Sequence, residues 1–305
     1  MKSTKFKLAL KIVVSLFFVS YLISKVNLQV MHDLNFSISY YLFMSVFITL
    51  ASLFIMSIRW LILCRIIAVK SDLVLLYKFY LKGMFFNIFL PGAIGGDIVR
   101  TKDLIEKYKV NLLKASTISI VERLSGLYVL FFVGLIGFCF ISIPINNYID
   151  FPIPKDLFFI APLSALILLP LFKKVVNKKM ELSYKVIMFV LFLSLAGQFG
   201  DIIIAFILSL YFNLSINFID FMFIMPIIYF ASVLPISMGG LGVREGTMAG
   251  LLALYGVEVS TAVILAFLMY LVKVLVGLIG WVIYIRSGSS RNNDVVSKQE
   301  RTDVI

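Results

Sequence analysis

FFNIFLPGAIGGDIVR, residues 85–100, is matched later in the chain by YFASVLPISMGGLGVR, residues 229–244. Both stretches fit the pattern F-x-x-x-L-P-x-x-x-G-G-x-x-x-R, which indicates an internal repeat with motifs at residues 86–100 and 230–244. Proline removes a backbone donor and paired glycines permit a sharp turn, so each copy is expected to break a helix. The coinciding residues are Phe86, Leu90, Pro91, Gly95, Gly96 and Arg100 in the first copy, and Phe230, Leu234, Pro235, Gly239, Gly240 and Arg244 in the second.

The residues around the two copies are strongly apolar. Of 305 residues, 61% are hydrophobic and 14% are charged, and the mean hydropathy is +1.04. This composition excludes a soluble domain and predicts an integral membrane protein. The net charge is +12, but the basic residues lie in short segments between apolar runs, which is typical of membrane topology and not of nucleic-acid binding. Cys64 and Cys139 lie far apart, so neither a disulfide framework nor a zinc site is expected.

Apolar runs long enough to cross a bilayer define the expected topology. Two further apolar stretches, 73–91 and 217–236, each end in a proline and a Gly-Gly pair, and we expect them to be broken or re-entrant segments. The predicted fold class is therefore all-α and polytopic. The first run lacks a small-x-small cleavage site, so it is expected to remain as a span. Full spans are expected at residues 8–26, 38–58, 118–143, 157–172, 186–212 and 259–285.

The distribution of lysine and arginine predicts that both termini lie in the cytoplasm of a plasma-membrane protein. Lys155 is the only lysine or arginine in the loops expected on the opposite side, at 27–37 and 144–156. An odd number of crossings then separates the two copies, so they are expected to be inverted repeats, whose interface forms the substrate site in transporters. The membrane domain is expected to cover residues 1–286. Residues 287–305, rich in serine, asparagine and charge, are expected to form a disordered cytoplasmic tail.

Three segments carry a family resemblance: FLPGAIGGDIVR, VERLSG at Val121 to Gly126, and LPISMGGLGVREG with the short stretch ending at Tyr255-Gly256. With them the sequence resembles, over residues 5–285, the flippase-like transmembrane proteins related to the membrane domain of lysylphosphatidylglycerol synthase. The resemblance implies a polytopic helical fold and movement of lipids or lipid-linked intermediates. Some relatives have been labelled glycan-transferring enzymes. Nothing after Arg286 is suited to form the soluble aminoacyl-transferring domain of the full synthases, so lipid aminoacylation is not expected.

Arg100 and Arg244 are the leading candidates for binding an anionic head group. A guanidinium offers a planar, bidentate fork to phosphate and stays charged at low dielectric, and a phospholipid or polyprenyl-phosphate head group suits it. The alternative is that each arginine reaches the interface or pairs with a neighbouring acid, Asp97 or Glu245. The glycines of the breaks, which free backbone amides beside the arginines, complete the predicted substrate site: Gly95, Gly96, Gly239 and Gly240.

Several polar residues fall inside the apolar runs. Asp201 lies near the middle of the fifth span, three residues from Gln198 and on the same helical face. An isolated charge at this depth costs about 3 kcal/mol, so Asp201 is expected to face a partner or a watery cavity. Lys273, at a similar depth in the last span, is the expected counter-ion; a structural ion pair and a role in proton coupling or substrate binding both stay open. Lys82, in the first broken segment, is a further candidate for lining the cavity. The alternative, that its side chain lies away from the cavity, stays open.

Four residues near the ends of spans are assigned to the membrane interface. Glu122 and Arg123 open the third span, where a helix N-terminus favours the acid and the cytoplasmic interface suits the base. The family resemblance in this segment adds substrate binding as the alternative. Arg59 and Trp60, at the end of the second span, are expected to be interfacial anchors.

Two functions follow from these features. The leading one is translocation of an anionic lipid or lipid-linked saccharide, with Arg100 and Arg244 holding the phosphate. The alternative is a membrane enzyme that transfers a glycosyl or other group to a polyprenyl-phosphate or phospholipid; a scaffold without transport activity leaves Asp201 and Lys273 unexplained. No Asp-x-Asp occurs and the sole histidine, His32, lies in an outer loop, so no metal, cofactor or histidine-based catalysis is expected. Membrane lipids, including polyprenyl-phosphate-linked intermediates, are the expected partners.

Overall fold

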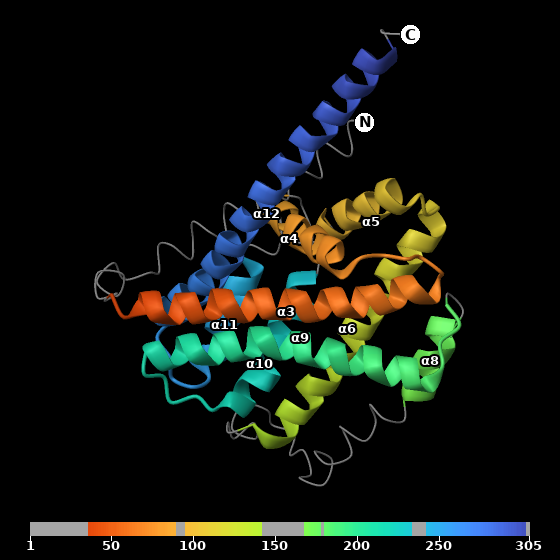
Figure 1. The fold of residues 1–305 in the computed structure, drawn as a ribbon. Coiled ribbons are helices and arrows are strands. Elements are labelled where there is room, and N and C mark those ends of the chain that lie inside the picture. Colours follow the sequence, from red (N-terminus) through yellow and green to blue (C-terminus); the bar gives the residue numbers. More distant parts are fainter. Residues whose placement is uncertain (1–35, 90–94, 142–167, 178–179, 234–241, 303–305) are drawn as a thin grey trace, which may run out of the picture.

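The structure is an assembly of helices. It is a computed structural model that describes residues 36–89, 95–141, 168–177, 180–233 and 242–302, with side chains as far as Arg286. Within these ranges the regular elements are all helices, which confirms the expected all-α fold (Figure 1). The helices are α3 (Ile38–Ile66), α4 (Leu73–Phe89), α5 (Gly95–Tyr108), α6 (Leu112–Phe140), α8 (Leu169–Asn177), α9 (Tyr184–Tyr211), α10 (Phe218–Val233), α11 (Val243–Ala253) and α12 (Val259–Thr302).

Four of these helices are long and apolar enough to cross a membrane: α3, α6, α9 and the part of α12 up to Arg286. They correspond to the spans expected at 38–58, 118–143, 186–212 and 259–285. Large apolar side chains on their outer faces, such as Phe47 and Phe192, are exposed by 63% and 62%, as suits helices that meet lipid. The expected span at 8–26, most of that at 157–172, and His32 lie outside the described residues.

The first repeat motif forms a helical hairpin of α4 and α5. At its open end, the backbone amide of Asp72 donates to the hydroxyl of Tyr108 over 3.0 Å. Near the closed end, the amide of Gly96 donates to the side-chain oxygen of Asn87 over 2.6 Å. The start of α4 and the end of α5 therefore lie next to each other. The chain enters and leaves the hairpin on the same side of the protein, as expected for a re-entrant segment. The second motif likewise lies between two packed helices, α10 and α11, although residues 234–241 lie outside the described part.

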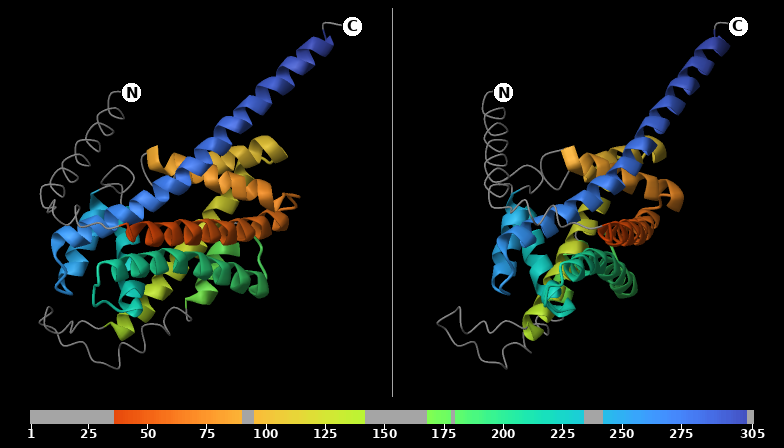
Figure 2. Two further views of the ribbon diagram at one scale, coloured as in Figure 1. Left: turned by 60° about the vertical axis from the view of Figure 1, so that its left-hand side comes forward. Right: turned by 90° about the vertical axis from the view of Figure 1, so that its left-hand side faces the viewer.

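The two halves of the chain exchange helices. In Figures 1 and 2, α3 and α9 run side by side, while α4 of the first half packs against α12 and α10 of the second half against α6. The stretch VGLIG occurs in both exchanged contacts, at residues 133–137 and 276–280. A Cβ on Gly280 would collide with the carbonyl of Leu81, and one on Gly137 would collide with the α10 backbone. The repeat therefore extends from the two motifs into the packing of the helices.

Replacing Gly280 with alanine is expected to destabilise the protein. The added methyl group meets the α4 backbone, which cannot move aside as a side chain can, so we expect a loss of about 1–3 kcal/mol in the free energy of unfolding. Gly250→Ala in α11 is the control, because a Cβ there meets no atom within 4 Å and alanine favours the helix. Detergent-solubilised variants can be compared by thermal unfolding. Equal midpoints for both variants would contradict the close packing of α4 on α12.

The last helix is longer than the apolar run that predicts it. The sequence gives a span ending at 285 and a disordered tail from residue 287, whereas α12 continues to Thr302 and projects away from the other helices (Figure 1). An existing helix gains one hydrogen bond for each added residue without a new nucleation step. The disorder expected from the composition of residues 287–305 stays a prediction.

Candidate functional site

A polar cavity lies between helices of both repeats. One part has a volume of about 390 Å³ and is lined by Arg100 of the first motif. The other part has a volume of about 330 Å³ and is lined by Arg244 of the second motif. The two parts adjoin each other, because they share the lining residues Leu53, Met56, Met84, Asn87, Asp201 and Tyr229. The two repeated arginines therefore line adjoining parts of the polar cavity, Arg100 the first and Arg244 the second.

Glu122 is the centre of the first part. Its side chain is 3% exposed and accepts from Arg59 over 2.7 Å and from Arg100 over 3.2 Å. The hydroxyl of Tyr80 also donates to this carboxylate. The four side chains come from α3, α4, α5 and α6, so this cluster joins four helices. A buried carboxylate is tolerated here because cationic and hydroxyl donors replace the water that it has lost.

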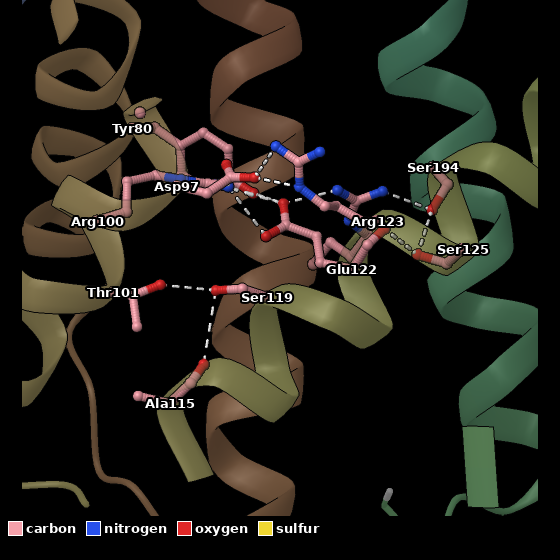
Figure 3. A network of polar contacts seen from close by, with 12 residues as sticks. Tyr80, Asp97, Arg100, Thr101, Ala115, Ser119, Glu122, Arg123, Ser125 and Ser194 are labelled. Carbon is pink, nitrogen blue, oxygen red and sulfur yellow. Dashed lines mark hydrogen bonds and ion pairs between the residues drawn. The ribbon is translucent and has the colours of Figure 1, made fainter. Parts of the chain in front are cut away.

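Asp97 extends the cluster along the wall of the cavity. Its carboxylate pairs with Arg100 three residues along α5, and also with Arg123 of α6, whose Nε lies 2.5 Å away. Figure 3 shows Asp97 and Glu122 in one network with the two arginines. Among the described residues, three guanidinium groups here face two carboxylates. Within the part of the chain that the structure describes, this cluster of five side chains therefore carries one net positive charge.

Aromatic rings and hydroxyl groups fix the orientation of the arginines. The guanidinium carbon of Arg100 lies 4.0 Å from the ring centre of Tyr80 and 5.2 Å from that of Trp60, within the range of cation–π attraction. Arg59 donates from Nη1 to the hydroxyl of Ser194 over 2.7 Å. Its Nε is buried without a hydrogen-bond partner among the described residues, and such a donor is suited to receive an acceptor from a ligand.

The structure corrects two predictions about the membrane interface. Glu122 was expected near a helix N-terminus, but α6 begins at Leu112, where Asn111 caps the helix by accepting from the Lys114 amide over 2.8 Å. Glu122 thus lies well inside the helix. The prediction was wrong because the first turns of α6 contain lysine, serine and threonine, so the apolar run begins later than the helix.

Arg59 and Trp60 are likewise not interfacial anchors. They are 4% and 0% exposed, because α3 continues beyond them to Ile66 and places them against α4 and α6. Sequence reasoning ended the span at the first charge, although WLILC continues the apolar run after Arg59. That continuation was the signal that places Arg59 in the bilayer. Tyr80, Asn87 and Ser194 carry no comparable signal, since each is an ordinary polar residue in an apolar helix.

Lys82 belongs to a separate interaction. Its ammonium lies 3.3 Å from the carboxylate of Asp103, with side chains 10% and 20% exposed. This ion pair joins α4 to α5 within the hairpin. Lys82 does not line the cavity of Arg100 and Arg244, so its role in the structure is to stabilise the hairpin.

The middle of the cavity contains a second polar group. Asp201 of α9 lies 3.7 Å from the ammonium of Lys273 in α12, which confirms the expected pairing of these two residues. The hydroxyl of Tyr229 donates to Asp201 and lies 3.3 Å from Lys273. Gln198 lines the cavity together with Asp201, as expected for residues on one helical face. The pair is about one quarter exposed, 28% for Asp201 and 23% for Lys273, and it faces the cavity and not lipid.

Arg244 marks the second part of the cavity. It donates to the carboxylate of Glu245 over 2.5 Å, and its guanidinium lies 5.0 Å from the ring of Tyr270. Glu245 also accepts from the amide of Gly242 over 2.6 Å. Both repeated arginines thus pair with a neighbouring acid and lie over an aromatic ring. This pairing leaves the charge in the second part balanced, unlike the surplus in the first.

The structure describes the paired glycines of the first repeat motif. Gly95 and Gly96 are buried and begin α5. A Cβ on Gly96 would collide with the carbonyl of Gly83 and with the side chain of Asn87, so glycine is required for the close approach of α5 to α4. Gly239 and Gly240 lie outside the described residues.

The pair of Asp201 and Lys273 is open to a double-mutant test. Asp201→Asn and Lys273→Met each leave one group without its counter-ion, and we expect each to lower the free energy of unfolding by about 1–3 kcal/mol. The double variant should lose less than the sum of the two, because the groups interact directly. The four proteins can be compared by unfolding in detergent. Additive losses would contradict a direct interaction.

Comparison with known families agrees with this architecture. Residues 8–280 match the family described as the lysylphosphatidylglycerol synthase TM region. A search of curated proteins finds no match. The matched range includes both repeat motifs, the arginine cluster around Glu122 and the central pair of Asp201 and Lys273. This chain belongs to the family of the lysylphosphatidylglycerol synthase transmembrane region.

Proposed function

We propose that this membrane protein binds the phosphate of an anionic lipid or lipid-linked saccharide in its cavity and moves the head group across the bilayer. The observation that carries the proposal is the net positive charge of the cluster formed by Arg59, Arg100 and Arg123 with two carboxylates. The surplus cation is Arg123, whose side chain is 36% exposed, so an anion that enters the cavity can act as its counter-ion. An anionic head group from the surrounding membrane supplies that counter-ion.

The donors of the cluster suit phosphate in particular. Arginine binds phosphate through two parallel N–H groups, and Arg100 is held by Tyr80 and Trp60 with its guanidinium at the cavity wall. The Nε of Arg59 is a buried donor without a partner among the described residues. These donors hold their positions before the ligand arrives, which reduces the entropy lost on binding.

The two parts of the cavity suit stepwise movement of a head group. Arg100 and Arg244 come from inverted copies of one motif and line adjoining parts of the cavity, so each is suited to hold the phosphate on its own side of the bilayer. Asp201 and Lys273 lie between them. Alternating exposure of such a site is the common mechanism of transporters with inverted repeats, with the two Gly-Gly breaks acting as opposed gates.

The proposed orientation follows from the charged loops. We propose a plasma-membrane protein with both termini in the cytoplasm, which assigns the open end of the α4–α5 hairpin to the cytoplasmic side. The part of the cavity lined by Arg100 then receives lipids of the inner leaflet. Membrane lipids, including polyprenyl-phosphate-linked intermediates, are the proposed ligands.

Reconstitution into vesicles tests the proposal. Purified protein is inserted into liposomes with trace amounts of labelled lipids that carry anionic, zwitterionic or polyprenyl-phosphate head groups, and transbilayer movement is measured by chemical quenching. We expect faster movement for at least one phosphate lipid of net negative charge. Lack of acceleration for every anionic lipid would refute transport. Formation of a new labelled lipid from nucleotide sugars in the same membranes would instead support a group-transferring enzyme.

A further inference from the structure

An apolar groove lies between α5 and α6, outside the polar cavity. Its volume is about 610 Å³. Ile98 on one wall is 61% exposed, and Leu112 and Ile120 on the other are 68% and 42% exposed. These side chains belong to no hydrophobic core, and α6 is a membrane-spanning helix. The groove is therefore open on the outer surface of α5 and α6.

The groove and the cavity share a wall. Asp97 and Arg123 line both of them, and their side chains form an ion pair between α5 and α6. On the inner side this pair contacts Arg100, and on the outer side it faces the groove. A single displacement of the Arg123 side chain, which is 36% exposed, would join the two spaces.

We propose that the groove binds the hydrocarbon chain of the same lipid whose phosphate the arginine cluster binds, and that the ion pair of Asp97 and Arg123 is the gate between them. This inference rests on the proposed function. A lipid is the ligand that fits both spaces, because an anionic group and an apolar chain are joined in one molecule. The groove supplies the apolar wall, and Arg123 supplies the cation at the boundary.

The length of the groove suits a chain of one leaflet. Leu112 and Arg123 are eleven residues apart on α6, which corresponds to about 16 Å along the helix axis. The hydrocarbon core of a bilayer is about 30 Å thick. The groove therefore extends along α6 for about half of that thickness, as far as the arginine cluster.

The gate opens without leaving a charge unpaired. Asp97 accepts from both Arg100 and Arg123, so a phosphate that draws Arg123 away leaves Asp97 with Arg100. Arg123 in turn exchanges one anionic partner for another. Removing a counter-ion from a buried charge is otherwise strongly unfavourable, and the shared carboxylate avoids that loss.

Photo-crosslinking tests the location of the chain. The full-length protein is reconstituted with the anionic lipid that moves fastest, carrying a diazirine on its acyl chain, and labelled peptides are mapped by mass spectrometry. We expect labelling of α5 and α6 at the groove, including Ile98 and Ile120. Ile120→Trp should fill the groove and reduce this labelling at least five-fold. Leu113→Trp is the matched control on the same helix, because Leu113 is 77% exposed and lies outside the groove.

The outcomes separate the groove from the transport function. Loss of groove labelling and of lipid movement in Ile120→Trp, with both retained in Leu113→Trp, supports the inference. Undiminished movement in Ile120→Trp, or labelling confined to other helices, overturns it while the proposed function stands. Absence of lipid movement in the unmodified protein refutes the proposed function itself and, with it, this inference.

Discussion

Replacing Glu122 with alanine is expected to lower the free energy of unfolding by about 3–5 kcal/mol, because it leaves buried arginines without their shared carboxylate. Glu122 is 3% exposed and pairs with Arg59 and Arg100, whose side chains are 5% and 8% exposed. Tyr80 would also lose its acceptor. The variant can be compared with the unmodified protein by unfolding in mixed detergent micelles.

Glu106→Ala is the matched control for Glu122→Ala. Glu106 pairs with Lys102 across 3.9 Å, with side chains 36% and 71% exposed, and such exposed ion pairs contribute about 1 kcal/mol or less. The two variants remove the same chemical group, one from the buried cluster and one from the surface of α5. Similar losses for both would show that Glu122 does not organise the buried cluster.

Replacing Arg100 with glutamine is expected to weaken binding of an anionic lipid by about 10- to 100-fold. Hydrogen bonds to charged groups contribute about 1.5–3 kcal/mol each, and every 1.4 kcal/mol changes affinity about tenfold. The fold should persist, because Glu122 keeps Arg59 and Asp97 keeps Arg123. Native mass spectrometry with a phosphate lipid of defined head group measures the affinity directly.

Arg65→Gln is the control for Arg100→Gln. Arg65 lies six residues beyond Arg59 on α3, and its side chain is exposed. This variant removes an equal charge from α3 without changing a residue that lines the cavity. If both variants lose the same affinity, general attraction to a basic surface explains the binding. If neither loses affinity, Arg100 does not hold the phosphate.

The sequence predicts those parts of the fold that depend on local chemistry. Proline together with paired glycines favours the end of a helix, so the interruptions before Arg100 and Arg244 follow from the motif, whereas Pro226 alone is accommodated inside α10. The sequence also predicts the pairing of Asp201 with Lys273, since a charge in an apolar span needs a partner. Their pairing across 3.7 Å needed no knowledge of how the helices pack.

The arginine cluster depends on packing and was not predicted. Arg59 and Glu122 are 63 residues apart, and their contact requires the register of α3 against α6. The scan for apolar runs also ended the second span at Arg59 and began the third just before Glu122, so it assigned both residues to the membrane surface. The exchange of α4 and α10 between the halves could not be predicted either. The glycines that permit it, Gly137 and Gly280, show their role only once the helices that pack against them are known.

The most direct test of this account is an experimental structure in lipid nanodiscs that contain an anionic phospholipid. We predict density for a phosphate in the cavity, within about 3 Å of the guanidinium of Arg100 and of the Nε of Arg59, the range of charge-assisted hydrogen bonds. In Arg100→Gln the same density should be lost or displaced toward Arg244. A cavity that holds only water in both proteins, with ordered lipid phosphates confined to the outer surface, would contradict the account.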